Sequence, residues 1–177
     1  MTSSSVVLLI SMPTLGQIST HTTKCLIGLT QYLSRKGIPF AFETYEFSDI
    51  VFSRNQLMSS FYTHKQFTHM LCLDSDMAIE PEGVQRLLDR GVHFAATAYP
   101  QKHPRWSRMR KLIEAEAELP EDQKSTIEQL LSRTWVYNHQ KADFGGKPWH
   151  PKRKDGFITV PATGTGLMLL SRAVPET

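Results

Sequence analysis

Short apolar runs alternate with helix-like segments over the first half of the chain, and this alternation constrains the fold more than any other feature. The runs have the length and the β-branched or aromatic content of strands, and they lie at residues 6–10, 38–45, 68–73 and 93–98. The segments between them carry apolar residues at helical spacing or helix-boundary signals, and they lie at residues 19–36, 53–65 and 81–89. This order predicts an α/β fold with a mostly parallel, Rossmann-like sheet flanked by helices.

Local signals set the ends of the predicted helices. Gly37 ends the first helix, because glycine readily adopts the left-handed conformation that closes a helix. Ser53 is expected to cap the second helix through its hydroxyl group. Pro81 lies at the start of the third helix and Gly91 follows its end. Residues 12–16 are predicted to form a loop after the first strand.

The third predicted strand ends in Asp74-Ser75-Asp76. Side chains two residues apart in a strand share a face, so we expect Asp74 and Asp76 to point the same way. Two adjacent carboxylates repel each other unless a cation lies between them, and oxygen ligands favour Mg²⁺ or Mn²⁺ over zinc. Ligands of open α/β sheets bind at the carboxyl ends of the strands. Position and chemistry together predict a metal-assisted phosphate or diphosphate site.

The acidic pair has three other interpretations. It can be a solvated turn. An EF-hand loop fails, since Ile79 stands where that loop needs glycine and Gln85 where it needs glutamate. A phosphatase of the haloacid dehalogenase type has a similar D-x-D motif, but Ala78 occupies the position that needs Thr or Val. That motif also usually follows the first strand, so a phosphatase stays a minor alternative.

Other candidate contacts are weaker by themselves. Arg54, in Ser53-Arg54-Asn55, can reach an anion at a helix start or can be an exposed arginine. Lys102 follows the fourth strand and can contact a phosphate or lie in a solvated loop. The glycines of residues 163–166 (Thr-Gly-Thr-Gly) let a backbone approach a ligand, although a plain turn is the more frequent explanation.

The second half of the chain changes character. Residues 101–156 begin and end with basic clusters around an acidic helical stretch at 114–128 that Pro120 interrupts. Trp106, Trp135 and Trp149 lie in or beside this part and either stack on a sugar or pack a small lobe. Strand patterns return at 157–160 and 167–170. The expected organisation is a single domain over 1–177, with a nucleotide-binding half at 1–100, an insertion at 101–156 and returning strands at 157–177.

Composition excludes several classes. The net charge of +3 is too small to indicate a nucleic-acid partner, and no apolar segment is long enough for a membrane span. The two cysteines form no disulfide framework, and the seven histidines show no zinc-ligand spacing. No signal peptide is recognisable, so a cytoplasmic location is expected.

Taken in order, four motifs resemble the GT-A fold, DxD-containing nucleotide-sugar glycosyltransferases of the small bacterial and viral type. The resemblance spans about residues 5–172 and is carried by the segments 53–55 (Ser-Arg-Asn), 68–76 (ending in Asp-Ser-Asp), 99–102 (Tyr-Pro-Gln-Lys) and 164–168 (Gly-Thr-Gly-Leu-Met). The implied activity is metal-dependent hexosyl or deoxyhexosyl transfer from a nucleoside-diphosphate sugar. UDP is the favoured nucleotide, GDP is possible, and the implied acceptor is a glycan or glycoprotein.

The resemblance also implies site residues. Asp76 binds Mn²⁺ or Mg²⁺ on the donor diphosphate, and Asp74 contacts the ion through water or holds the ribose. The remaining donor-binding residues are Pro13 and Thr14 at the base, with Arg54, Asn55, Ser75 and Lys102. Gly164, Thr165 and Gly166 line the sugar and acceptor side.

The chain departs from this family after the second glycine of the last motif. Members usually carry a later acidic motif and often a later histidine that completes the metal shell, and this sequence has neither. We therefore expect a donor-binding portion that lacks the C-terminal acceptor portion, with further domains of a longer polypeptide as possible partners. The catalytic base is unassigned, and both inverting and retaining transfer stay open. The alternative to an enzyme is a non-catalytic or truncated nucleotide-sugar-binding module.

Overall fold

The computed structural model describes residues 6–100, 104–137 and 153–174. The chain divides into two compact units, one formed by residues 1–97 with 165–177 and the other by residues 98–164. The predicted subdivision at residues 100 and 156 stays a prediction.

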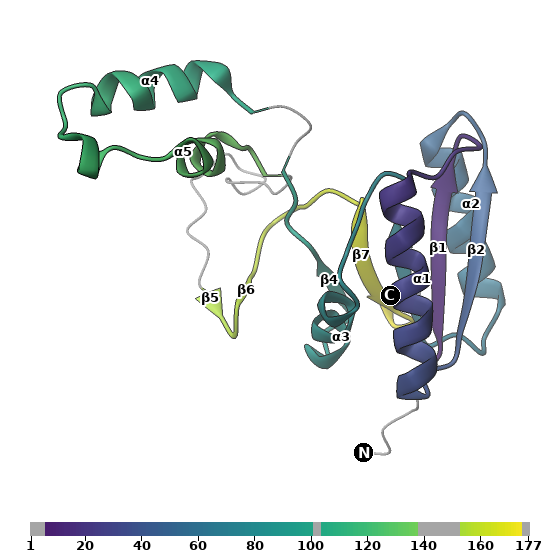
Figure 1. The fold of residues 1–177 in the computed structure, drawn as a ribbon. Helices are drawn as coiled ribbons and strands as arrows, with labels where there is room; N and C mark the ends of the chain where they lie inside the picture. The colour runs from purple at the N-terminus through teal and green to yellow at the C-terminus, as the bar shows by residue number, and fades with distance from the viewer. Residues whose placement is uncertain (1–5, 101–103, 138–152, 175–177) are drawn as a thin grey trace. The chain divides into compact units, whose positions relative to one another are not determined.

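The first unit is built on a five-stranded sheet with the order β2-β1-β3-β7-β4 (Figure 1). Its strands are β1 (Leu8–Thr14), β2 (Phe40–Glu46), β3 (His69–Leu73), β4 (Phe94–Ala96) and β7 (Leu167–Ser171). β1 pairs in parallel with β2 and β3, whereas β7 lies antiparallel between β3 and β4. Four strands therefore run in one direction and β7 in the other. The prediction of a mixed α/β fold with a mostly parallel sheet is confirmed.

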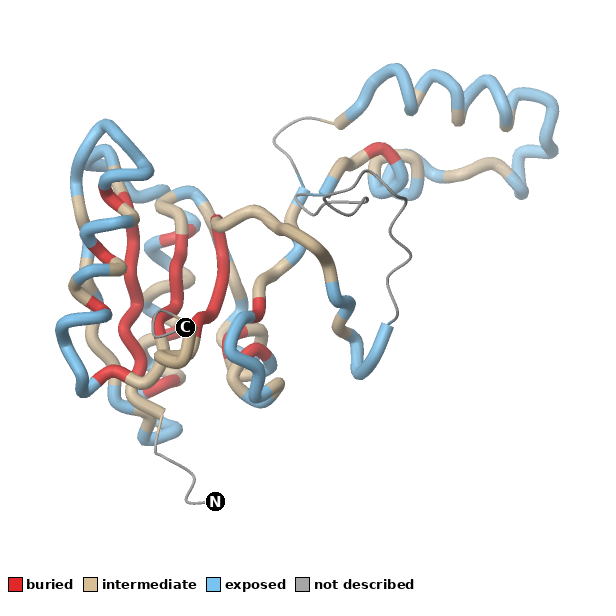
Figure 2. The backbone as a smooth tube through the Cα atoms, turned by 180° about the vertical axis from the view of Figure 1, so that it is seen from behind, coloured by how far each residue is buried: buried red, intermediate tan, exposed pale blue. Residues whose placement is uncertain are grey.

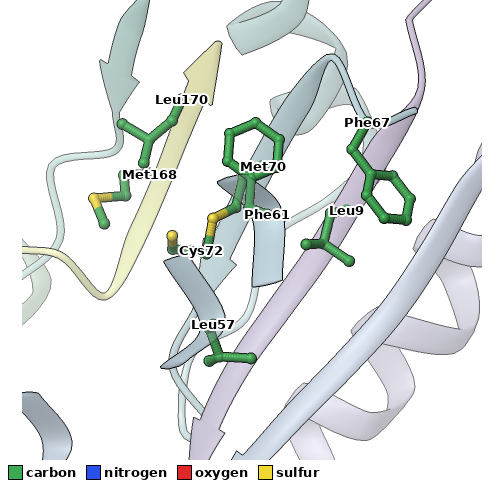
Figure 3. Packing of buried hydrophobic residues seen from close by; sticks show 8 residues of the cluster. All are labelled: Leu9, Leu57, Phe61, Phe67, Met70, Cys72, Met168 and Leu170. Carbon is green, nitrogen blue, oxygen red and sulfur yellow. The ribbon is translucent and has the colours of Figure 1, made fainter. Parts of the chain in front are cut away.

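Helices cover both faces of this sheet. They are α1 (Thr20–Lys36), α2 (Ile50–Thr63) and α3 (Pro81–Asp89). Leu57 and Phe61 of α2 pack against Leu9, Met70 and Leu170 on one face (Figure 3). α1 and α3 contact each other and lie on the other face (Figure 1). Because both faces are covered, the central strands are continuous apolar runs, and the buried residues of this unit concentrate on them (Figure 2).

The boundaries of α1 and α3 agree with the sequence signals. The Ser19 hydroxyl accepts a hydrogen bond from the Thr22 N–H at 3.1 Å, which caps α1. Gly37 has φ +67° and closes the helix in the left-handed conformation. Pro81 is the first residue of α3, as predicted, since it needs no N–H partner there.

The predicted start of α2 is wrong. The helix begins at Ile50, and its N-cap is Asp49, whose carboxylate accepts from the N–H groups of Val51 and Phe52 at 2.8 and 3.1 Å. Ser53 is buried inside the helix, and its hydroxyl donates to the Asp49 carbonyl at 3.0 Å. The apolar residues at 50–52 also suit a strand. Their pattern therefore gave no sign that a helix begins at Ile50 with Asp49 as its cap.

β1 also extends further than predicted, since Pro13 and Thr14 belong to the strand rather than to a loop. The Leu8 N–H and the Thr14 carbonyl hydrogen-bond to the β2 side, so odd-numbered residues of β1 turn their N–H groups to the β3 side. Pairing with β3 ends at Ser11. The missing N–H of Pro13 would point to the β3 side beyond the end of this pairing, so its absence costs the sheet no hydrogen bond.

The second unit contains α4 (Trp106–Glu116), the short 3₁₀ helix η1 (Glu121–Gln123), α5 (Ile127–Thr134) and the strand pair β5 (Arg153–Lys154) and β6 (Phe157–Ile158). The predicted acidic helical stretch over 114–128, broken at Pro120, is only partly helical: α4 ends at Glu116, η1 follows Pro120, and α5 begins at Ile127. Glu116 joins the two helices by accepting hydrogen bonds from Ser125 and Arg133. Across the described segments, no helix has the length and apolar character needed to cross a membrane.

Candidate functional site

The carboxyl edge of the sheet brings the acidic motif next to the start of β7. The Asp74 N–H donates to the Gly166 carbonyl at 2.8 Å, and the Thr97 N–H donates to the Leu167 carbonyl at 3.1 Å. Gly166 therefore lies directly beside Asp74, with Thr165 preceding it in the chain. The antiparallel β7 explains this proximity, since it enters the sheet at the edge where β3 and β4 leave it.

Asp74-Ser75-Asp76 forms a turn rather than the continuation of a strand. β3 ends at Leu73, and the Met77 N–H donates to the Asp74 carbonyl at 3.1 Å across the turn. The strand-alternation argument for the two carboxylates is therefore wrong. Asp74 and Asp76 still line one pocket, because the turn folds them toward the end of β1.

This pocket, hereafter the carboxyl-edge pocket, has a volume of about 450 Å³, within the range of small-molecule sites. Three segments line it besides the acidic turn: the end of β1, the loop that leads into α1, and the loop that leads into α2. Pro13 and Thr14 come from β1, so both predicted base-site residues lie in the same pocket as Asp74 and Asp76.

Backbone hydrogen bonds and one glycine hold these segments together. The Ser19 N–H donates to the Ser75 carbonyl at 2.9 Å, and the Phe47 N–H donates to the Thr14 carbonyl at 3.2 Å. Gly16 has φ +87°, and a Cβ atom there would lie 2.8 Å from Oε1 of Glu46. The loop after β1 therefore favours glycine at this position for its backbone conformation, while the exposed Glu46 side chain can move aside.

One wall of the pocket is apolar, and sequence reasoning missed it. Phe47 and Ile50 line the pocket and are 48% and 46% exposed. The Phe47 ring lies 5.0 Å from the Phe52 ring, centroid to centroid, and Phe52 contacts Tyr45 edge to face at 6.0 Å. The available signal was the apolar and aromatic cluster at residues 45–52, which continues past the end of β2 where polar loop residues are usual.

Arg54 contacts the acidic turn directly. Its Nη2 donates to Oδ1 of Asp74 at 2.8 Å, and both side chains are 29% exposed. Arg54 lies in the second turn of α2, so it is not at the helix start, where the sequence pattern predicted that it can reach an anion. Its Nε atom is buried and has no hydrogen-bond partner in the part of the chain that the structure describes.

Asp74 and Asp76 fit a hard divalent cation that is shared with a phosphate. The second carboxylate oxygen of Asp74 accepts no hydrogen bond within residues 6–100, 104–137 and 153–174. The same described residues contain no cluster of three or more His, Cys, Asp or Glu side chains that could hold a metal. Mg²⁺ commonly uses one or two carboxylates and completes its shell with phosphate oxygens and water. The two carboxylates by themselves do not make a closed structural metal site, and a shared ion on a phosphate stays a prediction.

Cys72 lies in β3, just before the acidic turn, and does not line the carboxyl-edge pocket. Burial raises the pKa of its thiol to about 11, against the opposing effects of a hydrogen bond from Ser11 and the nearby Arg54 charge. The Ser11 hydroxyl lies 3.7 Å from the sulfur atom. The thiol is therefore neutral near pH 7 and packs as a small apolar group.

The remaining predicted site residues do not all reach the pocket. Asn55 is exposed on α2 and, like Arg54, does not line the pocket. Gly164 belongs to the second unit, whereas Thr165 and Gly166 belong to the first. Lys102 and Trp149 lie outside the described residues.

No protein-family model matches this sequence, and no curated protein matches it. Among solved structures, the chain is similar to A197 from STIV, with a TM-score of 0.49 and 15% identity over 96% of this chain and 67% of that one. It is also similar to a glycosyltransferase involved in the glycosylation of the major capsid of PBCV-1, with a TM-score of 0.38 and 14% identity over 96% of this chain and 61% of that one. At such identities and TM-scores these likenesses assign no activity to this chain.

Proposed function

We propose that this chain binds a nucleoside-diphosphate sugar, with UDP favoured, and acts as a metal-dependent glycosyltransferase of the GT-A type. One observation carries the proposal: Asp74 and Asp76 line the same pocket as the aromatic wall at Phe47. A nucleoside diphosphate has a flat base at one end and a cation-binding diphosphate at the other, and the carboxyl-edge pocket offers a partner for each.

In this proposal, different lining residues of the pocket contact the base and the diphosphate of the ligand. Phe47 and Ile50 offer apolar surface to the base. The base would stack on or pack against these side chains and would make no contact with a charged group there. Thr14, Ser19 and Ser75 line the same space and offer hydroxyl groups to the ribose or phosphates. The carboxylates lie at the far side, where they would hold Mn²⁺ or Mg²⁺ on the diphosphate.

The proposed chemistry follows from this placement. A bound divalent cation would stabilise the negative charge that grows on the diphosphate as the sugar–phosphate bond breaks. Arg54 pairs with Asp74 at 2.8 Å and places a positive charge close to the same site. Thr165 and Gly166 would lie on the sugar side, since Gly166 is hydrogen-bonded to Asp74. The acceptor in this proposal is a glycan or glycoprotein.

A binding module without turnover is the second candidate, and the pocket lining favours it in one respect. Apart from Asp74 and Asp76, none of the described residues that line the pocket carries a carboxylate or an imidazole that could take a proton from an acceptor. The module would keep the nucleotide and metal contacts and would leave catalysis to other residues.

A turnover assay separates the two candidates. UDP-sugars are incubated with the chain and Mn²⁺, and release of UDP is followed with and without glycan acceptors. Metal-dependent release that Asp76→Asn abolishes supports the transferase. Metal-dependent binding without release supports the binding module. Asp122→Asn is the control, since it removes an exposed acid from η1 and should leave both signals unchanged.

A thermal-shift screen of nucleoside diphosphates identifies the base. A ligand at one hundred times its Kd stabilises the native state by about 2.7 kcal/mol, which is easily visible in Tm. We expect the largest shift with UDP and Mn²⁺. An equal shift from all nucleoside diphosphates would contradict a base-selective pocket.

A further inference from the structure

A second pocket lies at the opposite edge of the same sheet, where β3 and β4 begin and β7 ends. Its volume is about 380 Å³, and it lies wholly within the first unit. Four of its lining residues carry or can carry a positive charge: Lys65, His69, His93 and Arg172. No carboxylate is present among the described residues that line it. We call it the amino-edge pocket.

Two histidines and a serine form one row across three strands in this pocket. His69 of β3 is directly opposite Ser171 of β7, and the Ser171 N–H donates to the His93 carbonyl at 2.8 Å just before β4. Residues directly opposite each other in a sheet place their side chains on the same face. The two imidazoles therefore flank the Ser171 hydroxyl on one face of the sheet edge.

Hydroxyl groups fix both rings through the same nitrogen. His69 Nδ1 lies 2.9 Å from Thr68 Oγ1, and His93 Nδ1 lies 2.9 Å from Ser171 Oγ. The Nε2 atom of each ring makes no hydrogen bond to the described residues. When an imidazole is protonated, Nε2–H is a strong donor. Each ring thus keeps one donor for a ligand.

The fixed charges beside these rings are positive. Arg172 Nη2 donates to the carbonyls of Phe61 and His64 at 2.7 and 2.9 Å, and its Nε donates to the Phe67 carbonyl at 2.7 Å. These bonds hold the guanidinium charge at the pocket. Lys65 Nζ lies 4.1 Å from the Tyr62 ring centroid and lines the same space. Burial lowers the pKa of His69, and the charge of His93 lowers it further.

This arrangement disfavours a metal and favours an anion. A divalent cation between two imidazoles would face the charge of Arg172, and the described lining includes no carboxylate. A tetrahedral oxyanion would relieve the repulsion among the same groups. We propose that the amino-edge pocket binds the phosphate or sulfate group of a small anion between Nε2 of His69 and Nε2 of His93. This site is independent of the nucleotide site proposed above.

Binding at this site is coupled to protonation of the rings. The anion favours the protonated rings, so it raises the pKa of His69, and its affinity must fall as pH rises through that pKa. Sulfate is the sharper probe, because it stays a dianion throughout the pH range in which histidine titrates and any pH dependence then comes from the protein. Inorganic phosphate serves as the second probe.

The test follows the histidine ring signals of the full chain by NMR during sulfate titration, in EDTA, without nucleotide and at constant ionic strength. We expect saturable shifts of the His69 and His93 signals, and an apparent Kd that weakens by about tenfold per pH unit above the pKa of His69. His69→Asn and His93→Asn should each weaken binding by about tenfold or more. His21→Asn, on the exposed start of α1, should bind sulfate as the parent does.

Three results would overturn the proposal. One is a sulfate response that does not saturate or is independent of pH. Another is unchanged binding by His93→Asn, whose exposed position makes misfolding a poor explanation. The third is stabilisation by Zn²⁺ that needs both histidines while sulfate has no effect, which would identify a metal site instead. None of these results depends on nucleotide binding at the carboxyl edge.

Discussion

Replacing Arg54 separates two roles that the ion pair with Asp74 can play. The guanidinium occupies Oδ1 of Asp74 at 2.8 Å, so it competes with a cation for that oxygen. Arg54→Met keeps the length and the packing of the aliphatic chain while removing the charge. Mn²⁺ alone should bind this variant more tightly than the parent, because the positive charge beside Asp74 is removed and both of its carboxylate oxygens become available.

The expected size follows from the geometry. A partly exposed pair with side chains 29% accessible is worth about 1 kcal/mol, which corresponds to roughly a fivefold gain in Mn²⁺ affinity when the pair is absent. Stability should change little, since loss of the pair is offset by removal of the buried, unpartnered Nε, itself a cost of about 1–3 kcal/mol.

The assay is Mn²⁺ titration by calorimetry without nucleotide, together with urea unfolding. Arg35→Met is the matched control, because Arg35 is exposed in the last turn of α1. Weaker Mn²⁺ binding by Arg54→Met would refute the competition, since Arg54 would then be supporting the metal-ready form of Asp74.

Other predictions address the fold around the site. Phe61→Ala should lower the free energy of unfolding by about 3–5 kcal/mol in a urea titration, because Phe61 is fully buried against the sheet. In the same titration the control Phe42→Ala should cost less than about 1 kcal/mol, because Phe42 is 44% exposed. Gly16→Ala should destabilise the chain through its φ of +87° and weaken nucleotide binding, since its neighbours Leu15 and Gln17 line the pocket. Gly37→Ala, at φ +67° and outside the pocket lining, should affect stability alone. Cys72 should resist a thiol reagent at mildly alkaline pH until the chain unfolds, because burial raises its thiol pKa to about 11; rapid labelling of the folded chain would contradict this.

Sequence patterns predicted the elements whose signals are local. The caps at Ser19 and Gly37 act within one turn of α1, so a few neighbouring residues were enough to predict the helix ends. The apolar run of β3 is buried on both faces, so its hydrophobic pattern was enough to predict a strand. The start of α2 failed because Asp49 caps three apolar residues that also suit a strand. Helix initiation there is decided by the carboxylate and not by the residues that follow it.

The pairing of strands that lie far apart in the sequence could not be predicted from local patterns. β7 joins the sheet between β3 and β4 although the whole second unit separates it from β4 in sequence, and no local signal gives its antiparallel direction. The acidic pair was found because an apolar strand leads into it. The aromatic wall at Phe47 was missed, since its role appears only when the ends of β1 and β2 come together. The roles of Asp74, Asp76, Pro13 and Thr14 stay predictions.

The most direct test of the proposed donor site is calorimetric titration of UDP into the chain with Mn²⁺, repeated in EDTA and with Asp76→Ala. We predict saturable binding with Mn²⁺ that is lost in EDTA and abolished by Asp76→Ala, with Asp122→Asn binding as the parent does. If Asp76→Ala binds UDP with Mn²⁺ as tightly as the parent, the assignment of the metal–diphosphate site to Asp74 and Asp76 is wrong.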